Sequence, residues 1–301
     1  MFYYFLKKGF TFVFTLWCVF SLTFFLMHAI PGDPFIGDLE IPEEAWLSLK
    51  AHYGLDQPLF FQYFRYLKNV CCFDLGPSLA YPGQSVSQMI AQRFPVSAIL
   101  GLEALLLAVA AGLGFGLWSA LRGSCFQQET ASILSLIGLS LPVFVTAALL
   151  QWVFAIQLHW LPVARWGSLA HTILPALSLA LLPMASIARL TRAGLIEVFT
   201  KDYIQAAQSR GFSKMHIALC HGLKGALFPL IAYLGPAAVH LLTGSLIVEK
   251  IFSIPGLGQS MISSLVARDY PMILGLTLFS SSFLMFSSFV VDTIFAYLDP
   301  R

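Results

Sequence analysis

The 301-residue chain is 58% hydrophobic and only 11% charged, whereas about 25% of the residues of an ordinary soluble domain are charged. So few charges cannot cover the surface of a soluble protein of this length, which indicates a protein surrounded by lipid. The formal net charge of +2 gives no field strong enough to suggest nucleic acid as a partner.

Apolar segments long enough to cross a bilayer recur along the chain. A crossing helix needs roughly 20 apolar residues, because the hydrocarbon core is about 30 Å thick and each helical residue rises about 1.5 Å. The six predicted spans are 9–30, 96–121, 131–158, 169–188, 226–248 and 272–291. Pro95 is expected to open the second span, and Pro175 and Pro183 are expected to bend the fourth. The predicted fold class is an all-α membrane protein.

The first span follows Lys7 and Lys8, as a secretory signal would. The apolar region of such a signal has only about 7–15 residues and ends in a small-x-small cleavage site. The first span is longer, and no such site follows it, so we interpret it as an uncleaved anchor.

The positions of Lys and Arg predict the orientation. With the N-terminus inside, ten of these residues lie on the inner side and three in the short outer loops. Because cytoplasmic loops carry the excess of positive charge, both termini are predicted to be cytoplasmic. Residues 31–95 then form an extracytoplasmic lobe, with helices expected over 42–53 and 58–70. Residues 189–225 form a basic cytoplasmic loop.

No catalytic or nucleotide-binding motif is found in the sequence. The dipeptide Gly-Lys does not occur, so the GK[ST] phosphate loop is absent, and HExxH, DxDxDG and GxSxG are absent as well. The cysteines show no CxxC or Cys/His spacing typical of a metal site. We therefore predict that the chain is not an enzyme by itself and that it holds no cofactor or metal.

Two acidic residues fall in or beside the predicted spans. Charges inside a membrane often mark ion or substrate paths. Glu103 lies in the second span, and two roles stay open for it: a carboxylate that packs between helices, or a group that lines the pore. Asp292 follows the sixth span near the inner face, where a structural salt bridge or a helix cap is favoured. So sparse a polar core disfavours a carrier driven by ions.

The inner loop carries a helix–turn–helix pattern. Residues 202–210 are helix formers, and Gly211 is a typical helix stop. Ser213 can cap a second short helix that extends through His221. Ala206 and Ala207 are small enough for another protein to approach the backbone closely. The alternative is an amphipathic loop that lies on lipid headgroups.

This loop also resembles a known signature. Ala206-Ala207-x-x-x-Gly211 is similar to the EAA loop by which ABC-importer permeases dock on their ATPase, and residues 221–229 resemble the HALRNALxP run of the oligopeptide/dipeptide/nickel branch. Further blocks follow in the family's order over nearly the whole chain. They are residues 30–34, 54–58, 62–63, 74–78, 248–258, 268–271 and 298–301. The chain thus resembles the first-permease, B-type subunit of that branch.

The resemblance implies the ABC type I importer permease fold, with a cytoplasmic coupling helix and an extracytoplasmic lobe between the first two spans. Its parts would be residues 1–30, 31–95 and 96–301, with the coupling loop at 189–225. The implied ATPase-coupling residues are Asp202, Tyr203, Ala206, Ala207, Gly211, His221 and Leu223. The Glu that names the loop is replaced by Gln205, and Gly222 and Gly225 stand where Ala and Asn are usual.

The resemblance further implies a subunit of an ATP-driven, binding-protein-dependent importer in the bacterial cytoplasmic (inner) membrane. A second, similar permease would complete the translocation path, and two separate subunits would bind ATP and Mg. An extracytoplasmic solute-binding protein would contact the outer lobe and residues 255–258. Oligopeptides or dipeptides are the expected substrates. The alternatives are nickel or another small solute, and a secondary transporter or channel that works without an ATPase.

Overall fold

The computed structural model describes residues 2–29, 56–81, 83–121 and 141–298. Within them the chain forms helices joined by short turns, with one isolated antiparallel bridge between Pro77 and Ser85. The all-α fold class is thereby confirmed.

Five segments of the described chain are long and apolar enough to cross a membrane. The first lies in α1 (Phe2–Ala29), and α4 (Val86–Leu121) and α7 (Leu169–Phe199) provide the next two. The others are Pro229–Ile251, across α10 (Leu223–Leu242) and α11 (Leu246–Ile251), and Tyr270–Thr293 in α13 (Tyr270–Leu298).

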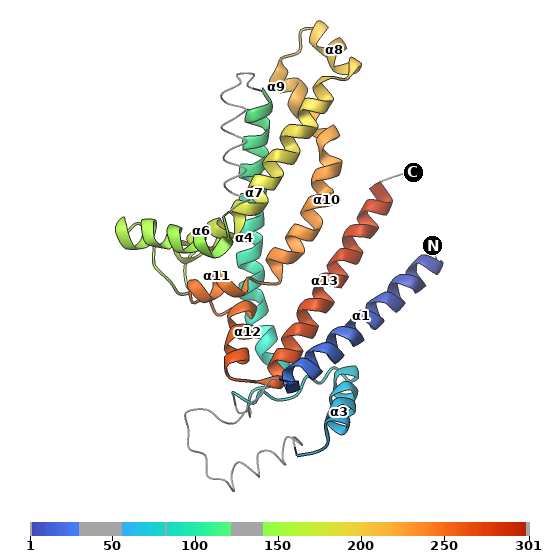
Figure 1. Ribbon diagram of the computed structural model, residues 1–301. Helices are drawn as coiled ribbons and strands as arrows, with labels where there is room; N and C mark the ends of the chain where they lie inside the picture. Colours follow the sequence, from blue (N-terminus) through green and yellow to red (C-terminus); the bar gives the residue numbers. More distant parts are fainter. Residues whose placement is uncertain (1, 30–55, 82, 122–140, 299–301) are drawn as a thin grey trace.

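The predicted span 131–158 lies partly outside the described residues. Its described part forms α6 (Val143–Leu150), continued by a π-helix η1 (Gln151–Gln157), and the 8 and 7 residues of these two elements are too few for a crossing. In Figure 1, α6 extends at a wide angle to α4 and α7. Five of the predicted spans therefore correspond to helices, and this span stays a prediction.

The helix of the second span begins at Val86, well before the expected start at Val96, and Pro95 lies inside it. Residues 86–95, predicted as part of the outer lobe, belong to α4. Ser85 Oγ accepts a hydrogen bond from the backbone N–H of Gln88 at 3.3 Å and so caps the true start. Packing of Val86 and its neighbours against α12 (Leu257–Val266) and α13 holds the helix through the proline.

Two other spans also differ from their predicted bounds. The fourth, expected to end at 188, continues to Phe199, because buried side chains recur at helical spacing through Leu195 and Val198. The fifth is not one helix: α10 ends at Leu242 and α11 begins at Leu246. Gly244 adopts a φ of 88° between them, which no right-handed helix can include. The helix expected over 58–70 is confirmed as α3 (Leu59–Cys71).

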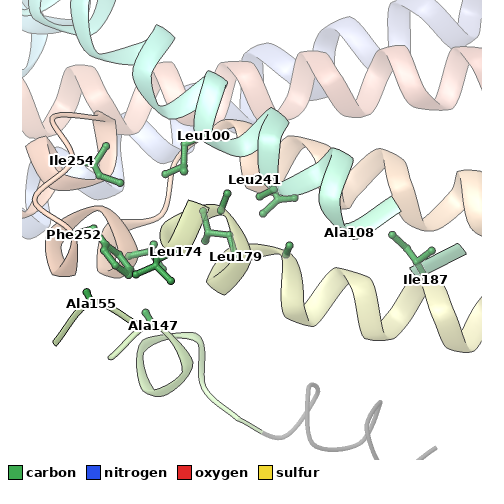
Figure 2. Close-up of a cluster of buried hydrophobic side chains, with 14 of the residues drawn as sticks. Leu100, Ala108, Ala147, Ala155, Leu174, Leu179, Ile187, Leu241, Phe252 and Ile254 are labelled. Carbon is green, nitrogen blue, oxygen red and sulfur yellow. The ribbon is translucent and has the colours of Figure 1, made fainter. Parts of the chain in front are cut away.

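The core is built on close contact between α4 and α7. Ala104, Ala108, Gly112 and Gly116 recur at every fourth residue of α4 and are all buried. A Cβ on Gly112 would lie 2.7 Å from Cγ2 of Ile187 on α7, so only glycine allows this approach. Figure 2 shows how side chains of α4, α7, α10 and the α11 region meet in one apolar cluster.

Two groups of short helices lie at opposite ends of the long helices (Figure 1). α8 (Asp202–Ser209) and α9 (Lys214–Ile217) lie beyond the end of α7, whereas α3 and α12 lie at the other end. α1 lies beside α13, with its C-terminal end toward α3. This arrangement separates a surface at the α8–α9 end from one at the α3–α12 end.

Candidate functional site

The α8–α9 unit, residues 201–222, has the helix–Gly turn–helix form expected from the sequence. Gly211 follows α8 with a φ of 85°. Its N–H donates to the carbonyl of Gln208 at 2.9 Å, and the N–H of Phe212 donates to the carbonyl of Ala207 at 3.4 Å. These two bonds form a Schellman turn, which ends α8 and reverses the chain.

The second helix of the unit continues further than the pattern predicted. Ser213 Oγ accepts from the N–H of His216 at 3.2 Å and caps α9, as expected. After Ile217 the chain passes into a π-helix, η2 (Ala218–Gly222), and then into α10 at Leu223. The α8–α9 unit is thus joined to α7 on one side and to α10 on the other without a flexible linker.

A small apolar cluster holds the unit on the end of α7. Ile204 of α8 and Ile217 of α9 are fully buried with Val198 of α7, and Ala207 packs against them. Ala206 is exposed. The two alanines therefore differ, because Ala206 faces outward while Ala207 contributes to the internal packing of the unit.

Several large apolar side chains of the unit are exposed, among polar ones such as Gln205, Gln208 and Lys214. Tyr203, Phe212, Met215 and Leu219 are between 47% and 56% exposed. We call these four residues with Ala206 the α8–α9 surface. Sequence reasoning missed Phe212, Met215 and Leu219, although Met215 and Leu219 have the four-residue spacing of one helix face. A group of exposed apolar side chains of this kind marks a site of interaction with protein or membrane.

The remaining predicted residues lie at different places. Asp202 is exposed in the first turn of α8, Leu223 is half-buried, and the His221 side chain lies outside the described part of the structure. Glu103 is half-buried on α4, with no hydrogen bond or ion pair to another described residue. The carboxylate of Asp292 accepts a hydrogen bond from Lys8 Nζ at 2.6 Å, and this ion pair joins α13 to α1.

A buried acid that sequence reasoning assigned only to an outer loop organises the opposite end of the molecule. Ser97 Oγ of α4 donates to Glu249 Oε1 at 2.8 Å, and the N–H of Gln259 donates to Oε2 at 3.1 Å. Ser97 Oγ also accepts from the N–H of Leu257 at 2.8 Å. The carboxylate thus provides a hydrogen-bond acceptor for a free N–H group at the start of α12, and it connects α4, α11 and α12.

This buried carboxylate leaves little room around it. A Cβ on Gly256 would lie 2.4 Å from Glu249 Oε2. Gly256, Leu257 and Gly258 are buried, and Pro255 alone of residues 255–258 is exposed. These residues, expected to contact a binding protein, are mainly occupied with internal packing.

A second buried acid connects residues 78–80 to α13. Asp269 accepts the N–H of Met272 at 3.2 Å and so caps α13. It also accepts the N–H groups of Leu79 at 3.2 Å and Ala80 at 3.3 Å, together with the hydroxyl of Ser78. Residues 78–80 are therefore held in place by the start of the last span.

Comparison with known proteins identifies the family of the chain. A model described as "binding-protein-dependent transport system inner membrane component" matches residues 112–301, and a model of the N-terminal part of such membrane components matches residues 1–101. The dipeptide transport system permease protein DppB of Bacillus subtilis (strain 168) is 44% identical over 99% of this chain and 97% of its own length. The oligopeptide transport system permease protein OppB of Escherichia coli (strain K12) is 40% identical over 95% and 94%.

The fold also matches that of a solved transporter. A chain from inward-facing structures of the MetNI methionine ABC transporter superposes with a TM-score of 0.55 at 16% identity, covering 71% of this chain and 97% of that one. The likeness shows the ABC type I importer permease fold. The chain therefore belongs to the family of binding-protein-dependent transport system inner membrane components, as a multi-pass permease subunit of a transporter complex.

Proposed function

We propose that the α8–α9 surface is the docking site of a separate ATP-binding subunit, and that the complex imports peptides. The observation that carries this proposal is a set of exposed large apolar side chains on a unit that packs on α7 and leads directly into α10, both membrane-spanning helices. The chain lacks a phosphate loop of its own, so ATP and Mg would be bound by the partner.

The complex would contain this chain, a second permease that completes the path, two ATP-binding subunits and an extracytoplasmic solute-binding protein. The α8–α9 end would be cytoplasmic, together with both termini. In Figure 1 the free ends of α1 and α13 point away from the α3–α12 end, and the excess of Lys and Arg is on the α8–α9 side. The outer side would then be the α3–α12 end.

Closure of the ATPase on ATP would move the spans through the packing of the unit. Ile204 and Ile217 fix α8 to α7, and η2 leads directly into α10. A displacement of α8 therefore reaches both helices rather than being lost in a loop. ATP shifts the equilibrium between inward and outward access only if the bound ATPase fits one of these states better.

The proposed substrates are dipeptides or oligopeptides. Support comes from two relatives, named as dipeptide and oligopeptide permeases, that match over nearly the whole chain at 44% and 40% identity. Nickel or another small solute is the alternative. Titration of the cognate solute-binding protein with a peptide panel and with nickel separates them, because tight binding of nickel without binding of peptides would refute the peptide assignment.

The docking proposal is tested with two separate variants, each of which adds one negative charge to a different side of α8. Ala206→Glu places a carboxylate on the α8–α9 surface, and we expect loss of ATPase copurification and of uptake. Gln208→Glu adds the same charge at another exposed position, about 160° around the helix at 100° per residue, and serves as the matched control. Ala207→Glu is unsuitable, because Ala207 packs inside the unit. Normal ATPase copurification and uptake with Ala206→Glu would refute the docking site.

A further inference from the structure

The short helix α3 is attached to the side of α1. Tyr63 is buried against α1: its ring lies 5.4 Å from Phe20 and 5.4 Å from Phe24, and its hydroxyl is 2.7 Å from Ser21 Oγ. Its ring also stacks on Phe25 at 5.5 Å. These contacts fix the depth of α3 along α1.

That depth is inside the hydrocarbon. The apolar segment of α1 is Leu6–Ala29, with 24 residues, and roughly 20 of them fill the hydrocarbon core when the helix is upright. Wherever that window begins, residues 10–25 lie within it. Ser21 and Phe25 are therefore in the hydrocarbon, and Tyr63, which contacts both, is at the same level.

An unbroken aromatic strip leads from the exposed face of α1 onto α3. Phe25, which is exposed, stacks on Tyr63, the Tyr63 ring meets Phe64 at 5.3 Å, and Phe64 meets Phe60 at 4.7 Å. Phe60 is 69% exposed and Phe64 is 51% exposed. These rings are thus continuous with the face that α1 presents to its surroundings.

The two charges of α3 lie away from the side that contacts α1. Arg65 and Lys68 are the only charged residues in α3, and both are basic and exposed. At about 100° per residue, Arg65 lies about 160° from Tyr63 and about 140° from Phe60. Lys68, four residues after Phe64, lies only about 40° from Phe64 and borders the aromatic strip. An exposed apolar flank bordered by basic residues, whose long side chains can carry their charges to the headgroups, fits a helix that lies in a membrane interface.

We propose that α3 is embedded in the membrane interface, in the leaflet that receives the C-terminal end of α1. Phe60 and Phe64 insert among the lipid chains, and Arg65 and Lys68 bind the anionic headgroups. A docked protein is disfavoured on this face, because the strip is continuous with a spanning helix and lies at hydrocarbon depth. Under the orientation proposed above, part of the segment 31–95 therefore contacts lipid rather than the solute-binding protein.

Site-directed spin labelling tests this placement. Single cysteines are introduced as Phe60→Cys, Phe64→Cys and Arg65→Cys in the full chain with its native cysteines replaced by serine. The chain is purified with its accompanying subunits and reconstituted in vesicles of phosphatidylethanolamine and phosphatidylglycerol. Leu22→Cys, on the face of α1 that is 64% exposed at that residue, provides the lipid reference.

Collision of each label with oxygen, which concentrates in lipid, is compared with collision with a water-soluble nickel chelate. We expect oxygen-to-chelate ratios at positions 60 and 64 equal to that at position 22, and a fall to a water-like ratio at position 65. A water-like ratio at 60 and 64 would overturn the proposal in favour of an aqueous surface. Protection from both reagents would overturn it in favour of a covering subunit. Positions 60 and 64 are read independently, so failure of one variant to fold leaves the test intact.

Discussion

Replacement of Gly101 by alanine tests the packing on which the membrane core depends. Gly101 is buried on α4 where this helix crosses the end of α10. A Cβ at this position would lie 2.3 Å from the backbone oxygen of Leu241 and 2.6 Å from its carbonyl carbon. An ordinary carbon–oxygen contact is about 3.3 Å, so the two helices must separate by about 1 Å.

The expected loss of stability follows from two opposing effects. Overpacking of this kind costs about 1–3 kcal/mol, and the upper end applies because the obstacle is backbone rather than a flexible side chain. Alanine recovers about 1 kcal/mol of helix propensity relative to glycine. The net destabilisation expected for Gly101→Ala is therefore about 2 kcal/mol.

Gly114→Ala is the matched control, since Gly114 lies on the same helix with nothing within 4 Å of its would-be Cβ. It should be neutral or stabilised by up to about 1 kcal/mol, which separates the two variants by about 3 kcal/mol. Each variant is heated in detergent at one rate, and the folded fraction is followed by gel filtration. A midpoint for Gly101→Ala equal to or above that of Gly114→Ala would show that the α4–α10 contact is not as close as described.

Three further predictions concern the turn, the ion pair and the buried acid. Gly211→Val should lose about 1–2 kcal/mol to its positive φ and lower uptake more than Gly211→Asn; the reverse order would contradict the Schellman turn. A double-mutant cycle of Lys8→Gln and Asp292→Asn should give a coupling below about 1 kcal/mol in thermal unfolding, because the pair is partly exposed; a larger value would indicate a desolvated pair. Glu249→Ala leaves the buried Ser97 hydroxyl without its acceptor and should lower the free energy of unfolding by about 1–3 kcal/mol for that donor, which a lower thermal midpoint would report; an unchanged midpoint would refute the interaction.

Features that depend on neighbouring residues could be predicted from the sequence. Gly211 ends a helix because it alone takes a positive φ without strain, and Ser213 caps the next helix by reaching an N–H three residues on. The helix expected over 58–70 likewise matches α3. Residues outside the described ranges, such as those expected to form a helix over 42–53, stay predictions.

Features that depend on distant partners could not be predicted in the same way. Pro95 was expected to start a helix, but packing against α12 and α13 keeps the chain helical from Val86. Ala206 and Ala207 are identical residues, and only the position of Ile204 against α7 and α9 decides which of them faces outward.

The sequence by itself determined that this chain is a membrane protein, because hydrocarbon thickness fixes how many apolar residues a span needs and the sequence contains apolar segments of that length. It also determined the helix–Gly turn–helix form, because caps and turns act over a few residues. Only the tertiary structure decided which faces are buried, as when Ser97 meets Glu249 across 152 positions of the chain. The physical reason is that burial is set by whatever part of the chain packs on a residue, and local sequence carries no record of that partner.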